Sequence, residues 1–227
     1  MSAGMRTLVY LHGFRSSPAS IKATRLSEYV AALPDATRPR LHVPELADRP
    51  SAAIAAVAQW VERHADAAML TFVGSSLGGY YATHLAERFD ARAVMINPAV
   101  RPYDDLQQWR GVQTNLYTGA AFDVTEAHFD ELRALRVARI TRPERYFLLV
   151  ETGDEVLDYR EAVAFYGGAW QYVHGGGDHS FTDFAAQLPA ILRFAGVTGE
   201  PSAAGPSQRA GPLGGRRREA PLRGNHK

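Results

Sequence analysis

One serine in the chain stands in a pattern that is able to support nucleophilic chemistry. Ser76 is the central residue of a G-x-S-x-G pattern, GSSLG, which joins an apolar run to a helix-like sequence. Such a junction is typical of a nucleophile elbow, in which a sharp turn between a strand and a helix holds one serine clear of the sheet. Glycine and serine also mark plain turns, so the pattern alone is weak. Ser75 lacks flanking glycines at the same spacing, and the pattern therefore favours Ser76.

A serine hydroxyl needs a base to take its proton, and histidine suits this role because its pKa lies near neutral pH. The order expected after such an elbow is serine, then acid, then histidine. Three histidines lie well downstream, at His174, His179 and His226. His226 is in the C-terminal tail, and His174 ends an expected strand, where histidine is more often a structural hydrogen-bonding group. We predict His179 as the base, because it lies in the glycine-rich GGGDHSF loop before the last helix.

The acid of such a site is expected in the TGDEVLD segment that follows the fifth strand. Asp154 is nearest to the strand end and is best placed to hold the imidazole tautomer. Asp158 is an alternative, although it is more typical of an N-cap for the next helix. Asp178 is a weaker alternative, because it is the sequence neighbour of His179.

Two backbone N–H groups are expected to form an oxyanion hole. One is that of Leu77, directly after the nucleophile, and the other is that of Phe14, in the loop after the first strand. His12 in that loop is expected to be structural. The sequence shows no cluster with metal-ligand spacing and no dinucleotide or Walker A loop, so no metal or cofactor is predicted.

Short apolar runs alternate with amphipathic segments, which predicts an α/β protein with about six parallel strands and helices on both faces. Ligands bind beyond the carboxyl ends of such strands, where the candidate residues converge. Ser51 is expected to cap the second helix, and Pro189 is expected to bend or divide the last one. Besides the strand before Gly74 and the helix after it, strands are expected at 7–12, 41–43, 91–97, 145–151 and 170–174, and helices at 18–33, from 51, 125–137, 159–166 and 182–194.

The segment 98–143 falls between the fourth and fifth strands and is predicted to be a small cap-like insertion. Residues 101–119 within it are polar and aromatic, without a clear period. Its aromatic residues are candidates to line an acyl pocket, although aromatic clusters more often belong to a core. These candidates are Trp109, Tyr117, Phe122 and Phe129.

The composition indicates one folded domain over 1–197 and a basic tail rich in Gly, Pro and Arg over 198–227, which we expect to be disordered. The 227 residues carry a formal net charge of +1 and no cysteine, which excludes disulfides and a cysteine nucleophile. No leader-like segment or long apolar run is seen, so we expect a cytoplasmic protein without a membrane span. A small-molecule partner is expected, and nucleic acid is not expected on the folded domain. For the tail, contact with nucleic acid or anionic lipid is the alternative to simple solvation.

The segments YLHGF, GSSLGG, TGDE and GGDHSF, in this order and spacing, resemble the α/β-hydrolase superfamily and, more narrowly, the YqiA-type bacterial esterases. The resemblance covers about residues 5–195, including NPAVRPY and the 113–119 segment. It implies a minimal α/β-hydrolase fold without the two leading antiparallel strands, and activity on acyl esters or acyl-CoA thioesters. It also implies Ser76, Asp154 and His179 as nucleophile, acid and base.

The leading hypothesis is a serine esterase that works through an acyl-enzyme. An acyl-CoA thioesterase is the alternative within the same chemistry. A catalytically silent hydrolase fold used for binding is an alternative from another class, and a lyase that keeps the three residues is a third.

Overall fold

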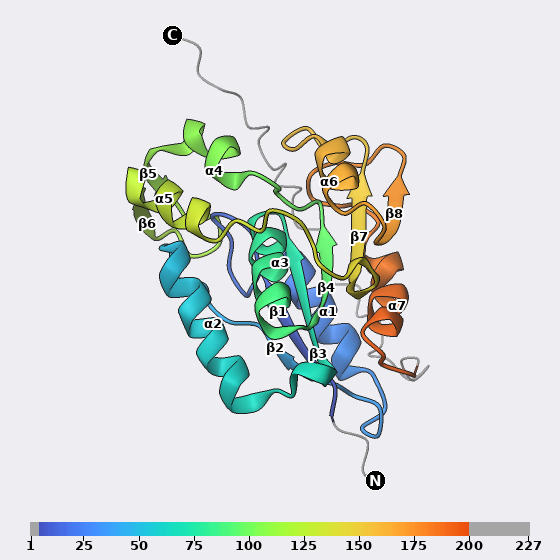
Figure 1. Ribbon diagram of the computed structural model, residues 1–227. Helices are drawn as coiled ribbons and strands as arrows, with labels where there is room; N and C mark the ends of the chain where they lie inside the picture. Colours follow the sequence, from blue (N-terminus) through green and yellow to red (C-terminus); the bar gives the residue numbers. More distant parts are fainter. Residues whose placement is uncertain (1–4, 200–227) are drawn as a thin grey trace, which may run out of the picture.

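The computed structural model describes residues 5–199, which form a central sheet covered by helices on both faces (Figure 1). The strand order is β2-β1-β3-β4-β7-β8, and every neighbouring pair is parallel, which confirms the predicted α/β fold with a six-stranded parallel sheet. The strands are β1 (Thr7–Leu11), β2 (Arg40–His42), β3 (Leu70–Ser75), β4 (Arg92–Ile96), β7 (Tyr146–Glu151) and β8 (Trp170–His174).

Alternating side chains of the central strands supply two separate cores. In β1, Val9 and Leu11 pack on one face of the sheet, while Leu8 and Tyr10 pack on the other, as the period of a strand requires. The face of Val9 is covered by α2 (Pro50–His64), α3 (Leu77–Phe89) and α6 (Tyr159–Phe165), and the face of Leu8 by α1 (Ile21–Ala31) and α7 (Phe184–Phe194). Burial on both faces explains why the central strands read as nearly continuous apolar runs.

The segment between β4 and β7 is an insertion that lies above α2 and α3, near the carboxyl ends of the strands (Figure 1). It contains α4 (Pro102–Asp105), an antiparallel pair formed by β5 (Gly111–Thr114) and β6 (Ala121–Val124), and α5 (Glu126–Ala134). Single 3₁₀ turns occur at Gln107–Trp109 here, and at Ala67–Met69 and Pro143–Arg145 elsewhere. The hairpin was not predicted, because each of its strands is only four residues long and largely exposed.

Two predictions are wrong: that Ser51 caps the second helix, and that Pro189 divides the last one. Ser51 does not cap α2, because the helix begins one residue earlier at Pro50, whose fixed φ suits the first helical position. The Ser51 N–H instead donates to Glu131 Oε2 of α5 at 3.1 Å. Pro189 does not divide α7, which runs without interruption through it. Proline there removes one helical hydrogen bond, and the buried face of α7 outweighs that loss.

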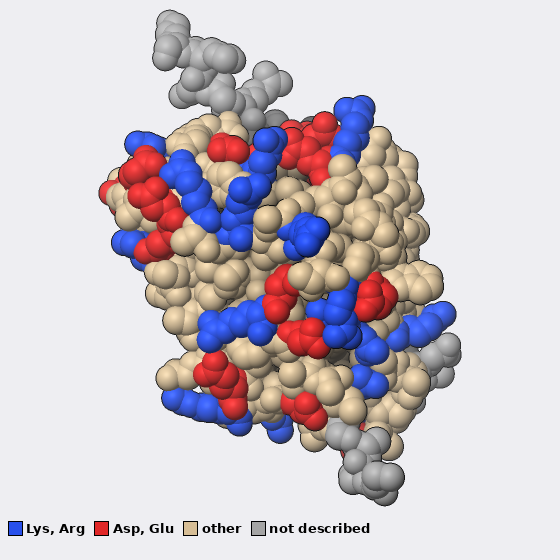
Figure 2. Space-filling model, viewed as in Figure 1, with Lys and Arg blue, Asp and Glu red and all other residues tan. Residues whose placement is uncertain are grey.

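Basic and acidic side chains are interspersed over the face shown in Figure 2, in keeping with a net charge near zero. Several of them form ion pairs between elements, including Arg49 with Glu131 and Arg101 with Glu161. Within residues 5–199, no helix combines the length and the apolar run needed to cross a membrane. The predicted basic tail, apart from residues 198 and 199, lies outside the described residues.

Candidate active site

Ser76 lies at the turn between β3 and α3, with φ 55° and ψ −122°. This region of backbone space is sparsely populated for residues with a side chain and costs about 1–3 kcal/mol. The turn is held by neighbouring backbone groups: the Ser76 N–H donates to Ile96 O at 3.0 Å, and its carbonyl accepts the N–H of Gly79 at 2.9 Å. The sheet therefore holds the strained backbone in place, and the Ser76 hydroxyl lies beyond the strand ends.

The glycines of the GSSLG pattern are explained by close backbone packing. A Cβ on Gly78 would lie 2.0 Å from Leu11 O of β1, and a Cβ on Gly74 would lie 2.1 Å from Gly78 O. No side-chain rearrangement relieves such contacts, because both partners are backbone atoms. The spacing of the two glycines thus lets α3 start directly against the sheet, as the sequence predicted.

The structure brings together the three side chains singled out in the sequence. His179 Nε2 lies 3.0 Å from Ser76 Oγ, and His179 Nδ1 lies 2.9 and 3.0 Å from the two carboxylate oxygens of Asp154. A carboxylate only accepts hydrogen bonds, so Nδ1 carries the proton and Nε2 is left to accept from the serine. The imidazole is 23% exposed and the Asp154 side chain 2%, so the ring faces solvent while its carboxylate partner is sealed from it.

The residues considered as alternatives to Asp154 and His179 have other partners. Asp158 caps α6 by accepting the Arg160 N–H at 3.0 Å, as the sequence predicted. Asp178 Oδ1 accepts the Ser180 N–H at 2.8 Å. His174 Nδ1 lies 3.4 Å from Glu151 Oε1.

The segment from Gly175 to Asp183, here called the histidine loop, is fixed by the fully buried carboxylate of Glu151 at the end of β7. This carboxylate accepts the backbone N–H groups of Asp178, Thr182 and Asp183 at 2.8, 3.0 and 3.1 Å, and the Thr182 hydroxyl at 2.8 Å. Burial alone would raise the pKa of Glu151, but these donors outweigh it and lower the pKa. Gly177 permits the approach, since a Cβ there would lie 1.9 Å from Glu151 Oε2.

Asn97, at the end of β4, joins the same loop to the sheet. Its Nδ2 donates to the carbonyls of Asp178 and His179 at 3.0 and 3.2 Å, and its Oδ1 accepts the Glu151 N–H at 3.0 Å. Sequence reasoning placed Asn97 at a strand end without a role and assigned none to Glu151. The signal available was that both are polar residues ending buried apolar strands, at the edge where ligands bind.

Residues 7–196 match the family described as Uncharacterised protein family (UPF0227). The chain belongs to this family. Its fold resembles that of a putative hydrolase from Agrobacterium vitis S4, with a TM-score of 0.66 at 19% identity over 86% of this chain and 88% of that one. It also resembles mouse alpha/beta hydrolase domain-containing protein 10, with a TM-score of 0.64 at 16% identity over 85% of this chain and 90% of that one. A third similar structure is Est1E from Butyrivibrio proteoclasticus, with a TM-score of 0.60 at 12% identity over 84% of this chain and 86% of that one. At these identities the likeness establishes the α/β-hydrolase fold.

In this UPF0227 protein the loop after β1 passes directly over the serine. A Cβ built on Gly13 would lie 3.3 Å from Ser76 Cβ, so the next residue, Phe14, is adjacent to the elbow. Leu77 is the first residue of α3, where a backbone N–H has no partner within its helix. His12 holds the loop: it is buried, its Nδ1–H donates to Gly13 O at 3.1 Å and its Nε2 accepts the Leu46 N–H at 3.4 Å. Burial lowers the pKa of His12, which suits a structural residue.

A cleft of about 420 Å³ opens above the elbow and includes both Ser76 and His179 in its lining. Its other walls come from the loop after β1, the first turns of α1, the histidine loop and Tyr117 of the insertion. Tyr117 lies in the turn between β5 and β6, and this hairpin tip docks onto the loop after β1. The Leu116 N–H donates to Arg15 O and Asn115 Nδ2 donates to Ser16 O, both at 2.8 Å.

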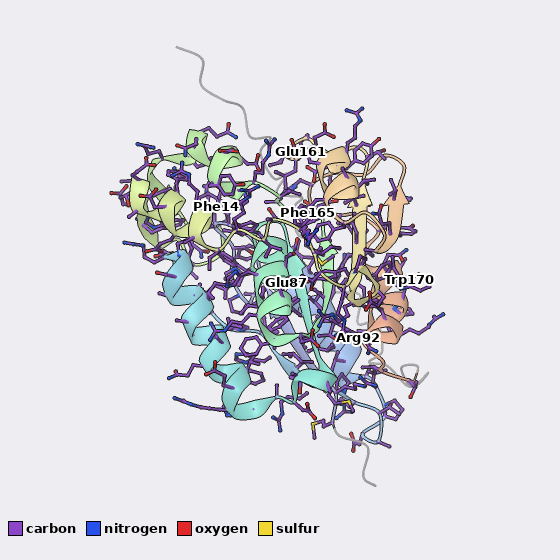
Figure 3. All side chains as sticks on the ribbon, viewed as in Figure 1. Phe14, Glu87, Arg92, Glu161, Phe165 and Trp170 are labelled. Atoms are coloured by element: carbon purple, nitrogen blue, oxygen red, sulfur yellow. The ribbon has the colours of Figure 1, made fainter. Side chains whose placement is uncertain are left out.

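The four aromatic candidates for an acyl pocket are separated by the structure. Tyr117 lines the cleft, whereas Phe129 is fully buried in the core between α5 and α2. Trp109 and Phe122 pack against Phe14, with ring centroids 6.5 and 5.8 Å apart from it. Phe14 itself lines the cleft, and in Figure 3 it lies toward the insertion. Within residues 5–199, no group of three His, Asp or Glu side chains is arranged to hold a metal ion.

Proposed function

We propose that the protein is a serine hydrolase that cleaves carboxylic esters through an acyl-enzyme. The observation that carries this proposal is the continuous chain of contacts from Asp154 through His179 to Ser76 Oγ, with the hydroxyl at the floor of an open cleft. The α/β-hydrolase fold supports it, and several similar structures bear the names hydrolase or esterase.

In the proposed reaction, Ser76 Oγ attacks the ester carbonyl while its proton passes to His179 Nε2. Asp154 keeps the proton of Nδ1 in place and stabilises the imidazolium that forms. The N–H groups of Phe14 and Leu77 hold the negative charge that develops on the carbonyl oxygen. His179 then gives its proton to the leaving alkoxide, which departs as the alcohol. A water molecule, deprotonated by His179, attacks the acyl-enzyme and releases the acid and the free serine.

The test compares wild type with Ser76→Ala on 4-nitrophenyl acetate and butyrate. Ser76→Ala should lose at least about a thousandfold in kcat/KM, because the nucleophile is gone while the binding groups remain. A fluorophosphonate should label wild type and Ser75→Ala, and should not label Ser76→Ala. Equal rates for wild type and Ser76→Ala would reject the mechanism. Absence of labelling in wild type would favour a catalytically silent binding protein instead.

A further inference from the structure

The cleft above Ser76 has an uneven charge. Among residues 5–199, those that line it include two cations, Lys22 and Arg25, and no aspartate or glutamate. Both cations come from the first turns of α1. Because the Asp154 side chain is buried beneath His179, its carboxylate does not line the cleft.

Lys22 is held close to the candidate catalytic residues. Its Nζ donates to the carbonyl of Ser180 at 2.8 Å, and Ser180 directly follows His179. This contact places a positive charge at the wall between α1 and the histidine loop. Arg25 lies three residues further along α1 and is therefore on the same side of the helix, at the exposed rim of the cleft.

The start of α1 adds to the positive character of this wall. Ser20 is the N-cap of the eleven-residue helix, its hydroxyl makes no capping hydrogen bond, and no acidic residue occupies the first turn. Ser20 and Ile21 both line the cleft, so the positive end of the helix dipole faces it. The hydroxyl-bearing side chains of Ser16, Ser180 and Tyr117 line the remaining wall and are able to donate to an anion.

We propose that the substrate carries a negatively charged group, a carboxylate or a phosphate, which lies against Lys22 and Arg25 while the ester carbonyl lies at Ser76. This inference rests on the proposed function and specifies its substrate class. The charge belongs either to the acyl part or to the leaving group. In both cases the complementary charge favours encounter and fixes the orientation of the substrate.

The experiment uses two pairs of esters, each pair differing only in charge. For the acyl part, monomethyl glutarate is compared with methyl 4-carbamoylbutanoate, its neutral amide. For the leaving group, the butyrate ester of 4-hydroxybenzoate is compared with that of 4-hydroxybenzamide. Wild-type kcat/KM should be at least about fivefold higher for the anionic member of one pair, and 0.5 M NaCl should reduce this preference.

Variants then assign the preference to the α1 wall. Arg25→Gln and Lys22→Gln should each reduce the ratio of anionic to neutral kcat/KM, and the double variant should bring it close to one. Arg25 is exposed, so its substitution should leave the fold intact. For Lys22→Gln, circular dichroism checks that the variant is folded. Arg63→Gln, on α2 across the sheet, is the matched control and should keep the wild-type ratio.

The outcomes separate the two proposals. A ratio at or below one on both pairs, with turnover that still depends on Ser76, would overturn the anionic substrate and leave the serine mechanism intact. A preference that survives the double variant would also overturn it. Equal rates in wild type and Ser76→Ala would reject the hydrolase mechanism, and the anionic substrate with it.

Discussion

Glu151 Oε2 accepts the backbone N–H of Asp178 at 2.8 Å, one residue before His179. The same carboxylate accepts three further donors of the histidine loop, and Asn97 binds the loop carbonyls from the neighbouring strand. The position of the imidazole relative to Ser76 thus depends on two polar residues that do not touch it with their side chains. Both lie at strand ends, so the rigidity of the sheet is transferred to a glycine-rich loop.

Replacing Glu151 with glutamine should lower kcat about a hundredfold and leave KM almost unchanged. The amide keeps the shape of the side chain, but its NH₂ group faces backbone N–H donors that need an acceptor, so the loop moves. A displacement of about 1 Å at the reacting groups is enough for a loss of this size. Steady-state kinetics on a nitrophenyl ester separate kcat from KM, and the rate of fluorophosphonate labelling should fall in parallel.

The control for this variant is Glu144→Gln, which changes an exposed carboxylate in the turn before β7. It should have wild-type kcat and KM. If Glu151→Gln, shown by circular dichroism to be folded, turned over as fast as wild type, Glu151 would not position the base.

Gly78→Ala should lower the free energy of unfolding by about 3 kcal/mol or more, because the new methyl group would lie 2.0 Å from Leu11 O. The contact joins α3 to β1, so relief requires the helix to move away from the sheet and carries Ser76 with it. Urea unfolding followed by fluorescence gives the stability change. Gly175→Ala is the matched control, since nothing lies within 4 Å of its added Cβ, and it should stay within about 0.5 kcal/mol of wild type.

The sequence was sufficient to predict the sheet and the three convergent side chains. Buried parallel strands are continuous apolar runs, such as Thr7–Leu11, and their carboxyl ends must meet at one edge. Ser76 and Asp154 follow such runs, and His179 follows the more exposed edge strand β8, so topology alone brings the three near one another. The close approach of Gly78 to β1 was also foreseeable, because a G-x-S-x-G turn leaves no room for a side chain.

Other features depend on contacts that no local pattern encodes. Four-residue strands like Gly111–Thr114 are too short to show a period, and the tip of their hairpin docks through Asn115 on the loop after β1. The sequence suggested that four insertion aromatics line the pocket, but of these four only Tyr117 lines the cleft, while Trp109 and Phe122 pack against Phe14. The wall of the cleft that comes from α1 was not predicted either.

Asp154→Asn should reduce kcat by roughly 10⁴-fold without unfolding the protein, because an amide is able to donate to Nδ1 and so stabilises the tautomer that cannot accept from serine. The variant to compare with Asp154→Asn is Asp158→Ala, which changes the aspartate four residues further along the chain. It removes the cap of α6, which costs about 1 kcal/mol of stability, and should retain activity. The reverse result, with Asp158 essential and Asp154 dispensable, would move the acid to the cap position.

The attachment of the insertion to α2 should weaken in acid. The Arg49 guanidinium, together with the Ser51 N–H, lowers the pKa of Glu131 from its ordinary value of 4.5 to about 2. A carboxylate whose pKa is lower in the folded state than in the unfolded state stabilises the fold at any pH above its unfolded-state pKa. This stabilisation is lost as the pH falls toward the folded-state pKa. The contribution of Glu131 is therefore fully present above about pH 4.5 and disappears between there and pH 2.

Urea unfolding of wild type and Glu131→Gln at several pH values tests this titration. At pH 7 the variant should be less stable, and the difference should narrow steadily below pH 4.5 as the wild-type carboxylate takes up its proton. Glu62→Gln, which removes an exposed pair with Arg88, should differ from wild type at pH 7 by no more than about 1 kcal/mol. A difference between wild type and Glu131→Gln that is constant from pH 7 to pH 2.5 would mean that packing, and not the charge of Glu131, holds α5 against α2.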